Sequence, residues 1–168
     1  VPLERRAPHQ VRVPPSPPPP PDLFELVGES SSGEEGDCDM YARFDLGEAR
    51  LYALVDTGAR HSVIAKTCLD EIVSYAGQSA VRSQRPAKMA FNVGKRHQQV
   101  HATQRVRLRL RTTMVDGRQS MVDMKVYVCD ELSSRMVLGR ATLNRWGANI
   151  SFSSGELRLD RATADTKA

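Results

Sequence analysis

The stretch Leu54-Val55-Asp56-Thr57-Gly58-Ala59 places one carboxylate on a Thr-Gly turn directly after an apolar strand. Asp and Gly also dominate ordinary surface turns, because both tolerate the backbone conformations that turns need. Here, however, a second apolar strand, Val63-Ile64-Ala65, follows soon after the turn. The pattern therefore indicates a loop whose two arms are both held in a protein core, with Asp56 between them.

A second motif lies far downstream. Met136-Val137-Leu138-Gly139-Arg140 is expected to form an apolar strand ending at a glycine, with a short helix over Ala141–Trp146. The order and separation of the two motifs resemble the retropepsin family, the aspartic proteases of retroviruses and long-terminal-repeat retrotransposons. His61-Ser62 after the first motif is similar to gypsy-type elements in particular. The resemblance runs from about Met40 to about Phe152.

This resemblance implies a role for each motif residue. Asp56 would be the catalytic aspartate, Thr57 would bond across a dimer interface, and Gly58 and Ala59 would border the substrate. In such enzymes two aspartates hold the attacking water, one as general base and the other protonated. Because Asp-Thr-Gly occurs once in this chain, two chains would have to meet to build one site. The residues expected behind the active-site loop are Val137, Leu138, Gly139 and Arg140.

The flap, a hairpin that closes over substrate in this family, is expected near Lys88–Arg96. Met89, Phe91 and Val93 alternate as strand residues do, and a turn is predicted at Asn92-Val93-Gly94. Family flaps are usually richer in glycine, and an ordinary surface hairpin is the alternative. The flap residues expected to contact substrate are Phe91, Asn92, Val93 and Gly94.

Arg60 is a departure from the family pattern. Many retroviral members carry an acid at this position, and that acid can pair with the arginine that corresponds to Arg140. The pair cannot form here, so Arg140 needs another partner. We expect Arg60 to line the substrate cleft and to favour acidic or polar residues near the scissile bond. The alternative is an exposed surface cation, since long basic side chains usually keep their heads in water.

The chain divides into three parts by composition. Residues 1–37 are predicted to be a disordered linker, because nine of the ten prolines precede Asp22 and a polar, acidic run follows them. Leu23–Val27 is an apolar island within this linker that either docks on the body or is a self-processing site. Residues 38–160 are predicted to be the protease domain, and residues 161–168 a flexible tail.

The body is predicted to be mostly strands. Met40–Asp45 and Arg50–Val55 would form a hairpin, and residues 67–76 a short helix or a loop. Two further strands are expected at Arg105–Arg111 and Met121–Cys129, with a turn at Asp116-Gly117 between them. The predicted fold is all-β, a small closed β-barrel-like acid protease fold with one short C-terminal helix, homodimeric. Its dimer interface is expected mostly from a C-terminal hairpin, residues 148–152 and 156–159.

Charge and cysteines limit the partners. The net charge is +4, the pI is about 9.2, and Arg105, Arg107, Arg109 and Arg111 would lie on one strand face. A solvated face explains this row better than nucleic-acid binding, although weak RNA association in a larger assembly stays open.

The three cysteines lack paired metal-ligand spacing, so no metal or cofactor is expected. No apolar run is long enough to span a membrane. Free thiols indicate the cytoplasm or a virus-like particle.

The sequence thus predicts an aspartic endopeptidase, active as a homodimer, that cleaves a viral or retroelement polyprotein. The alternative is a catalytically silent or domesticated dimer of the same fold that acts as a protein-binding module. Its Pro-rich arm would then recruit partners that read proline-rich segments.

Overall fold

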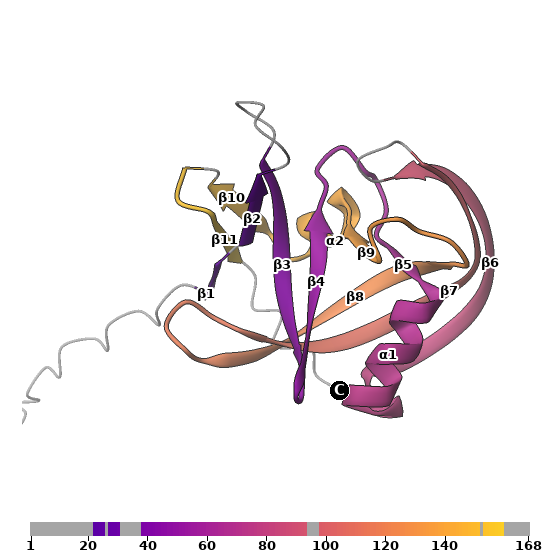
Figure 1. Cartoon of the computed structure of the whole chain (residues 1–168), viewed down its shortest axis with the longest axis horizontal. Coiled ribbons are helices and arrows are strands. Elements are labelled where there is room, and N and C mark those ends of the chain that lie inside the picture. The colour runs from indigo at the N-terminus through magenta and orange to yellow at the C-terminus, as the bar shows by residue number, and fades with distance from the viewer. Residues whose placement is uncertain (1–21, 26, 31–37, 94–97, 152, 160–168) are drawn as a thin grey trace, which may run out of the picture.

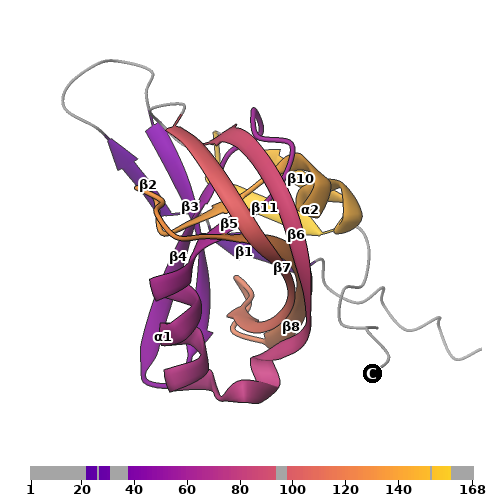
Figure 2. The ribbon, with the colours of Figure 1, turned by 90° about the vertical axis from the view of Figure 1, so that its right-hand side faces the viewer.

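The computed structural model describes residues 22–25, 27–30, 38–93, 98–151 and 153–159. The Pro-rich arm and the C-terminal tail predicted from the sequence lie outside these residues. Figure 1 shows the order of the elements along the chain, and Figure 2 shows them from the side. The strands are β1 (Asp22–Glu25), β2 (Val27–Ser30), β3 (Cys38–Leu46), β4 (Ala49–Val55), β5 (Val63–Ala65), β6 (Val81–Val93), β7 (Gln98–Thr113), β8 (Gln119–Cys129), β9 (Met136–Leu138), β10 (Ala148–Ser151) and β11 (Glu156–Leu159). The helices are α1 (Lys66–Ala76), the 3-10 turn η1 (Gln78–Ala80) and α2 (Arg140–Arg145).

Most strands belong to one sheet that curls on itself. Its order is β2-β3-β4-β9-β5-β8-β7-β6, and an additional contact between β3 and β7 closes it. At that closure Asp45 lies opposite Arg111, and the Thr113 hydroxyl donates to Asp45 Oδ2 at 2.6 Å. A second sheet has the order β1-β11-β10. The prediction of a closed, all-β structure is confirmed.

The predicted first hairpin is confirmed. β3 and β4 pair antiparallel up to Leu46 opposite Ala49, which leaves a two-residue turn at Gly47 and Glu48. Gly47 has φ +76°, a conformation that glycine adopts without steric cost. Inward-facing Phe44 on β3 is fully buried, so the alternation that predicted a strand places every second residue in the core.

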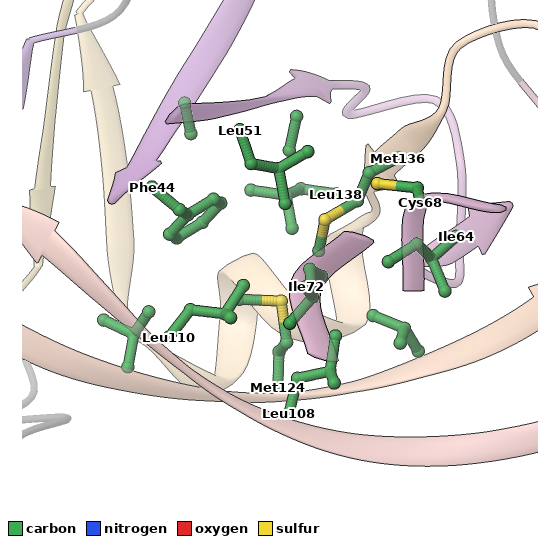
Figure 3. Close-up of a cluster of buried hydrophobic side chains, with 14 of the residues drawn as sticks. Phe44, Leu51, Ile64, Cys68, Ile72, Leu108, Leu110, Met124, Met136 and Leu138 are labelled. Carbon is green, nitrogen blue, oxygen red and sulfur yellow. The ribbon is translucent and has the colours of Figure 1, made fainter. Parts of the chain in front are cut away.

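The core lies inside the curled sheet (Figure 3). Leu108 and Leu110 on β7 alternate with arginines, and only the leucines point inward. Each such side chain contributes about 1.5–3 kcal/mol when fully buried. The labelled members from neighbouring elements are Phe44, Leu51, Ile64, Cys68, Ile72, Met124, Met136 and Leu138.

Residues 67–76, which the sequence left open between helix and loop, belong to α1, which begins at Lys66. Cys68, Leu69 and Ile72 are its buried residues, and the spacing of three and four places them on one helix face. Figure 1 shows α1 beside the end of the barrel where the β3–β4 turn lies. The helix therefore covers an end of the core that the strands leave open. The structure thus has a second α-helix besides the predicted C-terminal one, which is α2.

Strand pairing in the structure begins before residue 38, the predicted start of the protease domain. β1 pairs antiparallel with β11, and β2 pairs antiparallel with β3 from Val27 opposite Tyr41 to Ser30 opposite Cys38. The sequence indicated docking only as one option for its apolar island, and placed the polar residues after it in a linker. Strand pairing uses backbone groups, so polar side chains do not prevent a segment from joining a sheet edge.

The predicted C-terminal hairpin forms from β10 and β11. Leu157 and Leu159 on β11 are buried in the main core, with Ile150 of β10 packed against it. The apolar side chains of this hairpin therefore stabilise the subunit itself. Within the described residues, β10 is an edge strand of the second sheet.

Within the described ranges, neither helix is long and apolar enough to cross a bilayer. The same residues contain no cluster of three His, Cys, Asp or Glu side chains that could hold a metal ion.

Two thiols are buried in the core. Burial raises the pKa of Cys68 to about 11 and that of Cys129 to about 11, so both stay protonated at neutral pH. In a Cys38→Ser chain we expect native Cys68 and Cys129 to react with a thiol reagent at pH 7.5 far more slowly than the urea-unfolded chain. Absorbance of the released thiolate measures this, and equal native and unfolded rates would contradict the burial.

Candidate active site

The Asp56 loop begins where β4 ends. The Asp56 N–H donates to the Leu138 carbonyl at 3.0 Å, and the Ala59 N–H donates to the Asp56 carbonyl at 3.2 Å. The Gly58 N–H donates to Asp56 Oδ1, also at 3.0 Å. The half-buried Asp56 carboxylate is thus oriented by its own loop, while Thr57 and Gly58 are exposed beside it.

Strand β9 lies between the two arms of this loop. It pairs parallel with β4, where Val55 lies opposite Leu138, and antiparallel with β5, where Val63 lies opposite Val137. Val137 and Leu138 are completely buried. The sequence placed these residues behind the active-site loop, and they lie there.

Gly139 lets the backbone of this strand approach the loop closely. The next two N–H groups, of Arg140 and Ala141, donate to the carbonyls of Ala59 and Arg60 at 2.8 and 2.9 Å. A Cβ built on Gly139 would lie 2.4 Å from the His61 carbonyl oxygen, a distance that no real side chain tolerates. Glycine is required here for space, and not for an unusual φ.

Ser62 adds a side-chain link that sequence reasoning missed. Its hydroxyl accepts the Gly139 N–H at 2.9 Å and shares a 2.5 Å hydrogen bond with the Thr142 hydroxyl of α2. Ser62 and Thr142 are both buried. The local sequence held no signal for this contact, because serine and threonine are common in loops and the two lie 80 positions apart. Ser62 therefore supports the loop and is not placed to act as a nucleophile.

His61 lies on the other side, against two aromatic rings. Its ring centroid is 6.0 Å from that of Phe91 on β6 and 5.3 Å from that of Tyr127 on β8, and Phe91 and Tyr127 are 5.6 Å apart. Such separations and tilted geometries are favourable for aromatic pairs. These contacts place the β6–β7 hairpin next to the Asp56 loop, and Tyr127 was not anticipated from the sequence.

The neighbourhood also affects His61 itself. Partial burial, and then the positive charge of Arg60, lower the pKa of His61 from its ordinary 6.5. The neutral ring is therefore favoured by folding. Its contribution to stability is present above pH 6.5 and is lost as the pH falls through the lowered value.

The predicted flap corresponds to the β6–β7 hairpin, in which Phe91 lies opposite Val100. The predicted turn at residues 92–94 is shifted, because Asn92 and Val93 are still in β6 and pair with Gln99 and Gln98. A long strand pair carries its hydrogen bonds past these residues, whose turn preference is overridden by pairing. Gly94 lies outside the described residues, as do Lys95 and Arg96.

Arg60 and Arg140 both have exposed side chains at this end of the barrel. No salt bridge holds either of them within the part of the chain that the structure describes. Arg140 instead contributes its backbone N–H to the loop. The predicted cleft role of Arg60 stays a prediction.

The arrangement offers one oriented carboxylate with its Oδ2 uncommitted to the loop. Such a group can accept a proton from water, but polarising an amide carbonyl needs a second, protonated acid. No other acid of this chain shares the loop with Asp56. The loop itself therefore supplies one carboxylate of such a pair.

Comparisons with known proteins find similarity in structure alone. No protein-family model matches the chain, and no curated protein matches it. Among solved structures, it is similar to the retroviral protease-like domain of Ddi1 from Leishmania major, with 17% identity, TM-score 0.48, 72% of this chain and 87% of that one covered. It is also similar to a retropepsin-like aspartic protease from Rickettsia conorii, with 16% identity, TM-score 0.40 and coverage of 82% and 86%. A third is the EIAV protease, with 20% identity, TM-score 0.37 and coverage of 61% and 83%.

These similar structures are retropepsin-like aspartic protease domains. Because the identities and TM-scores are low, no function and no site residue is assigned to this chain from these structures.

Gly139→Ala tests the close approach behind the loop. The added Cβ would meet backbone atoms of His61, and we expect it to lower the free energy of unfolding by about 1–3 kcal/mol, as for other overpacked cores. Urea unfolding followed by circular dichroism measures this.

Gly58→Ala is the matched control, because its Cβ would approach only the Asp56 side chain, at 3.2 Å. We expect a clearly smaller loss from that variant. Equal midpoints for the two variants would show that the approach at Gly139 is not tight in solution.

Proposed function

We propose that this chain is an aspartic endopeptidase whose active form is a homodimer with one Asp-Thr-Gly loop from each chain. The observation that carries the proposal is the oriented, half-exposed Asp56, fixed by Gly58 and by the Leu138 carbonyl. A fixed carboxylate needs only its symmetry copy to form a pair that shares one proton. The pair would activate a water for attack on a peptide carbonyl.

The surroundings of Asp56 fit a peptide substrate. Thr57 and Gly58 are exposed beside the carboxylate, so the partner loop and an extended peptide can both reach it. The β6–β7 hairpin stands next to the loop through Phe91, which is the place for a cover over bound peptide. In this proposal Thr57 bonds across the twofold axis, and Ala59 and Asn92 border the substrate.

The biological setting is part of the same proposal. The order of the two motifs favours a viral or retroelement origin, and His61-Ser62 after the first motif favours the gypsy type, with a polyprotein as substrate. The enzyme would then act in the cytoplasm or in a virus-like particle. The dimer would form through the exposed edge of β10, since β11 already has a partner on both sides.

Asp56→Asn tests the chemistry. The variant keeps the shape of the side chain but cannot act as a general base, so we expect peptidase activity on a peptide library to disappear. Circular dichroism would confirm that the fold is retained. Full activity of the variant would exclude Asp56 as the catalytic group, whereas absence of peptidase activity in the wild type would favour the protein-binding module.

Mixing the two proteins tests the dimer. Adding Asp56→Asn chains to wild type should lower the activity per wild-type chain, because only dimers with two intact loops hold both carboxylates. Glu48→Gln, a change in the exposed β3–β4 turn at the other end of β4, is the control for addition of protein and should not lower it. Activity proportional to wild-type concentration at every ratio would contradict a shared site.

Arg60→Glu tests substrate preference. Reversing the charge beside the cleft should weaken cleavage of sequences with acidic residues near the scissile bond and favour basic ones. Peptide-library profiling measures the preference, with Lys66→Glu as the control, since Lys66 is an exposed cation at the start of α1. An unchanged preference would remove Arg60 from the cleft.

A further inference from the structure

A row of arginines follows β7 on the outer side of the barrel. Because side chains alternate along a strand, the arginines share the face opposite to the buried residues of β7. Successive members are two residues apart, which corresponds to about 6.6 Å along a strand. The row consists of Arg105, Arg107, Arg109 and Arg111, and Val106, Leu108 and Leu110 are the buried residues between them.

The neighbouring strands add cations to the same face. On β6, Arg85 lies directly opposite Arg105. On β8, Lys125 lies directly opposite Arg107. The seven cations that we call the basic face are Arg82, Arg85, Arg105, Arg107, Arg109, Arg111 and Lys125.

Two depressions on the basic face are each lined by three or more of its cations. A depression of about 120 Å³ is lined by Arg85, Arg105, Arg107 and Lys125 together with the Ser83 hydroxyl, and no acid borders it. A larger one, of about 520 Å³, lies at the end of the row. Its lining includes Arg82, Arg109, Arg111 and Asp45. Cations that converge on a hollow can surround an anion, whereas cations on a convex surface cannot.

The charges on this face are largely unopposed. Two acids lie opposite members of the row. Asp45 lies opposite Arg111, accepts a hydrogen bond from the Thr113 hydroxyl and lies 3.9 Å from Arg43. Asp123 lies opposite Arg109 and is only 8% exposed, and its negative charge offsets the positive charge of Arg109 alone. Within the described residues, none of the seven cations forms a salt bridge. Burial, and then the charges of Arg105, Arg145, Arg107 and Arg85, lower the pKa of Lys125, which agrees with mutual repulsion.

We propose that the basic face binds the phosphate backbone of single-stranded nucleic acid without reading its sequence. A regular row of guanidinium groups suits a polyanion with regularly repeated charges, and arginine bonds phosphate oxygens in pairs. Tyr127, the aromatic residue opposite Arg105, is already packed against His61 and Phe91, so base stacking adds little. Binding therefore comes from charge and depends strongly on salt.

The test is binding of the full chain to a fluorescein-labelled oligouridine, followed by anisotropy between about 50 and 200 mM salt, where phosphate-dominated binding weakens steeply. Arg107→Gln/Lys125→Gln removes two phosphate contacts. The slope of log K against log salt should become shallower by about 1.4, at roughly 0.7 per contact for single strands. Arg85→Gln/Arg105→Gln, on the same depression, should give a similar change.

The matched control is Lys66→Gln/Arg140→Gln, which removes two exposed cations that line neither depression. It should leave the slope nearly unchanged. A control as damaging as the paired variants would mean that net charge alone binds the oligonucleotide, and would overturn the site. Equal affinity for poly-glutamate of matched charge would overturn phosphate recognition in favour of an acidic peptide. None of these measurements depends on peptidase activity, because Asp56 is not part of the face.

Discussion

The position of Asp56 depends on one close backbone approach, that of Gly139 to the loop between β4 and β5. The strand that ends at Gly139 is hydrogen-bonded to both arms of that loop, and the two N–H groups after it bind loop carbonyls. Ser62 and Thr142 close the same contact from the side of α2. A loop carrying a carboxylate would otherwise be mobile, because loops have few buried contacts of their own. Here it is fixed by backbone geometry, which side-chain changes at the surface cannot easily disturb.

Much of the fold could be predicted because local patterns and tertiary structure agree. The alternation in β7, the Gly47 turn and the two apolar motifs each specified an element that is present. The start of the sheet at Asp22 could not be predicted, since strand pairing at an edge uses backbone groups that every sequence has. A turn was predicted at residues 92–94, but strand pairing continues through Asn92 and Val93, again because pairing uses backbone groups.

The part of the candidate site that is formed by contiguous residues could be predicted, and the part that is formed by contacts between distant segments could not. Asp56, Thr57 and Gly58 are contiguous, so their turn chemistry is visible in the sequence. Tyr127 and Thr142 reach the same loop from distant segments, and nothing in their own neighbourhoods distinguishes them from other core or helix residues. Arg60 illustrates a different limit, because a sequence shows that a charge is present but not what it faces.

The pairing of β1 and β2 with the two sheets determines how a proteolytic cut near these strands would affect the folded chain. Proteases bind their targets as extended, accessible peptide, and a bond inside a paired strand is shielded from them until that strand detaches. A cut upstream of Asp22 would leave the folded body whole. A cut between β1 and β2 would instead separate β1 from the rest of the chain, so that only its pairing with β11 would retain it. Cuts at these two places would therefore have different effects on the stability of the folded chain.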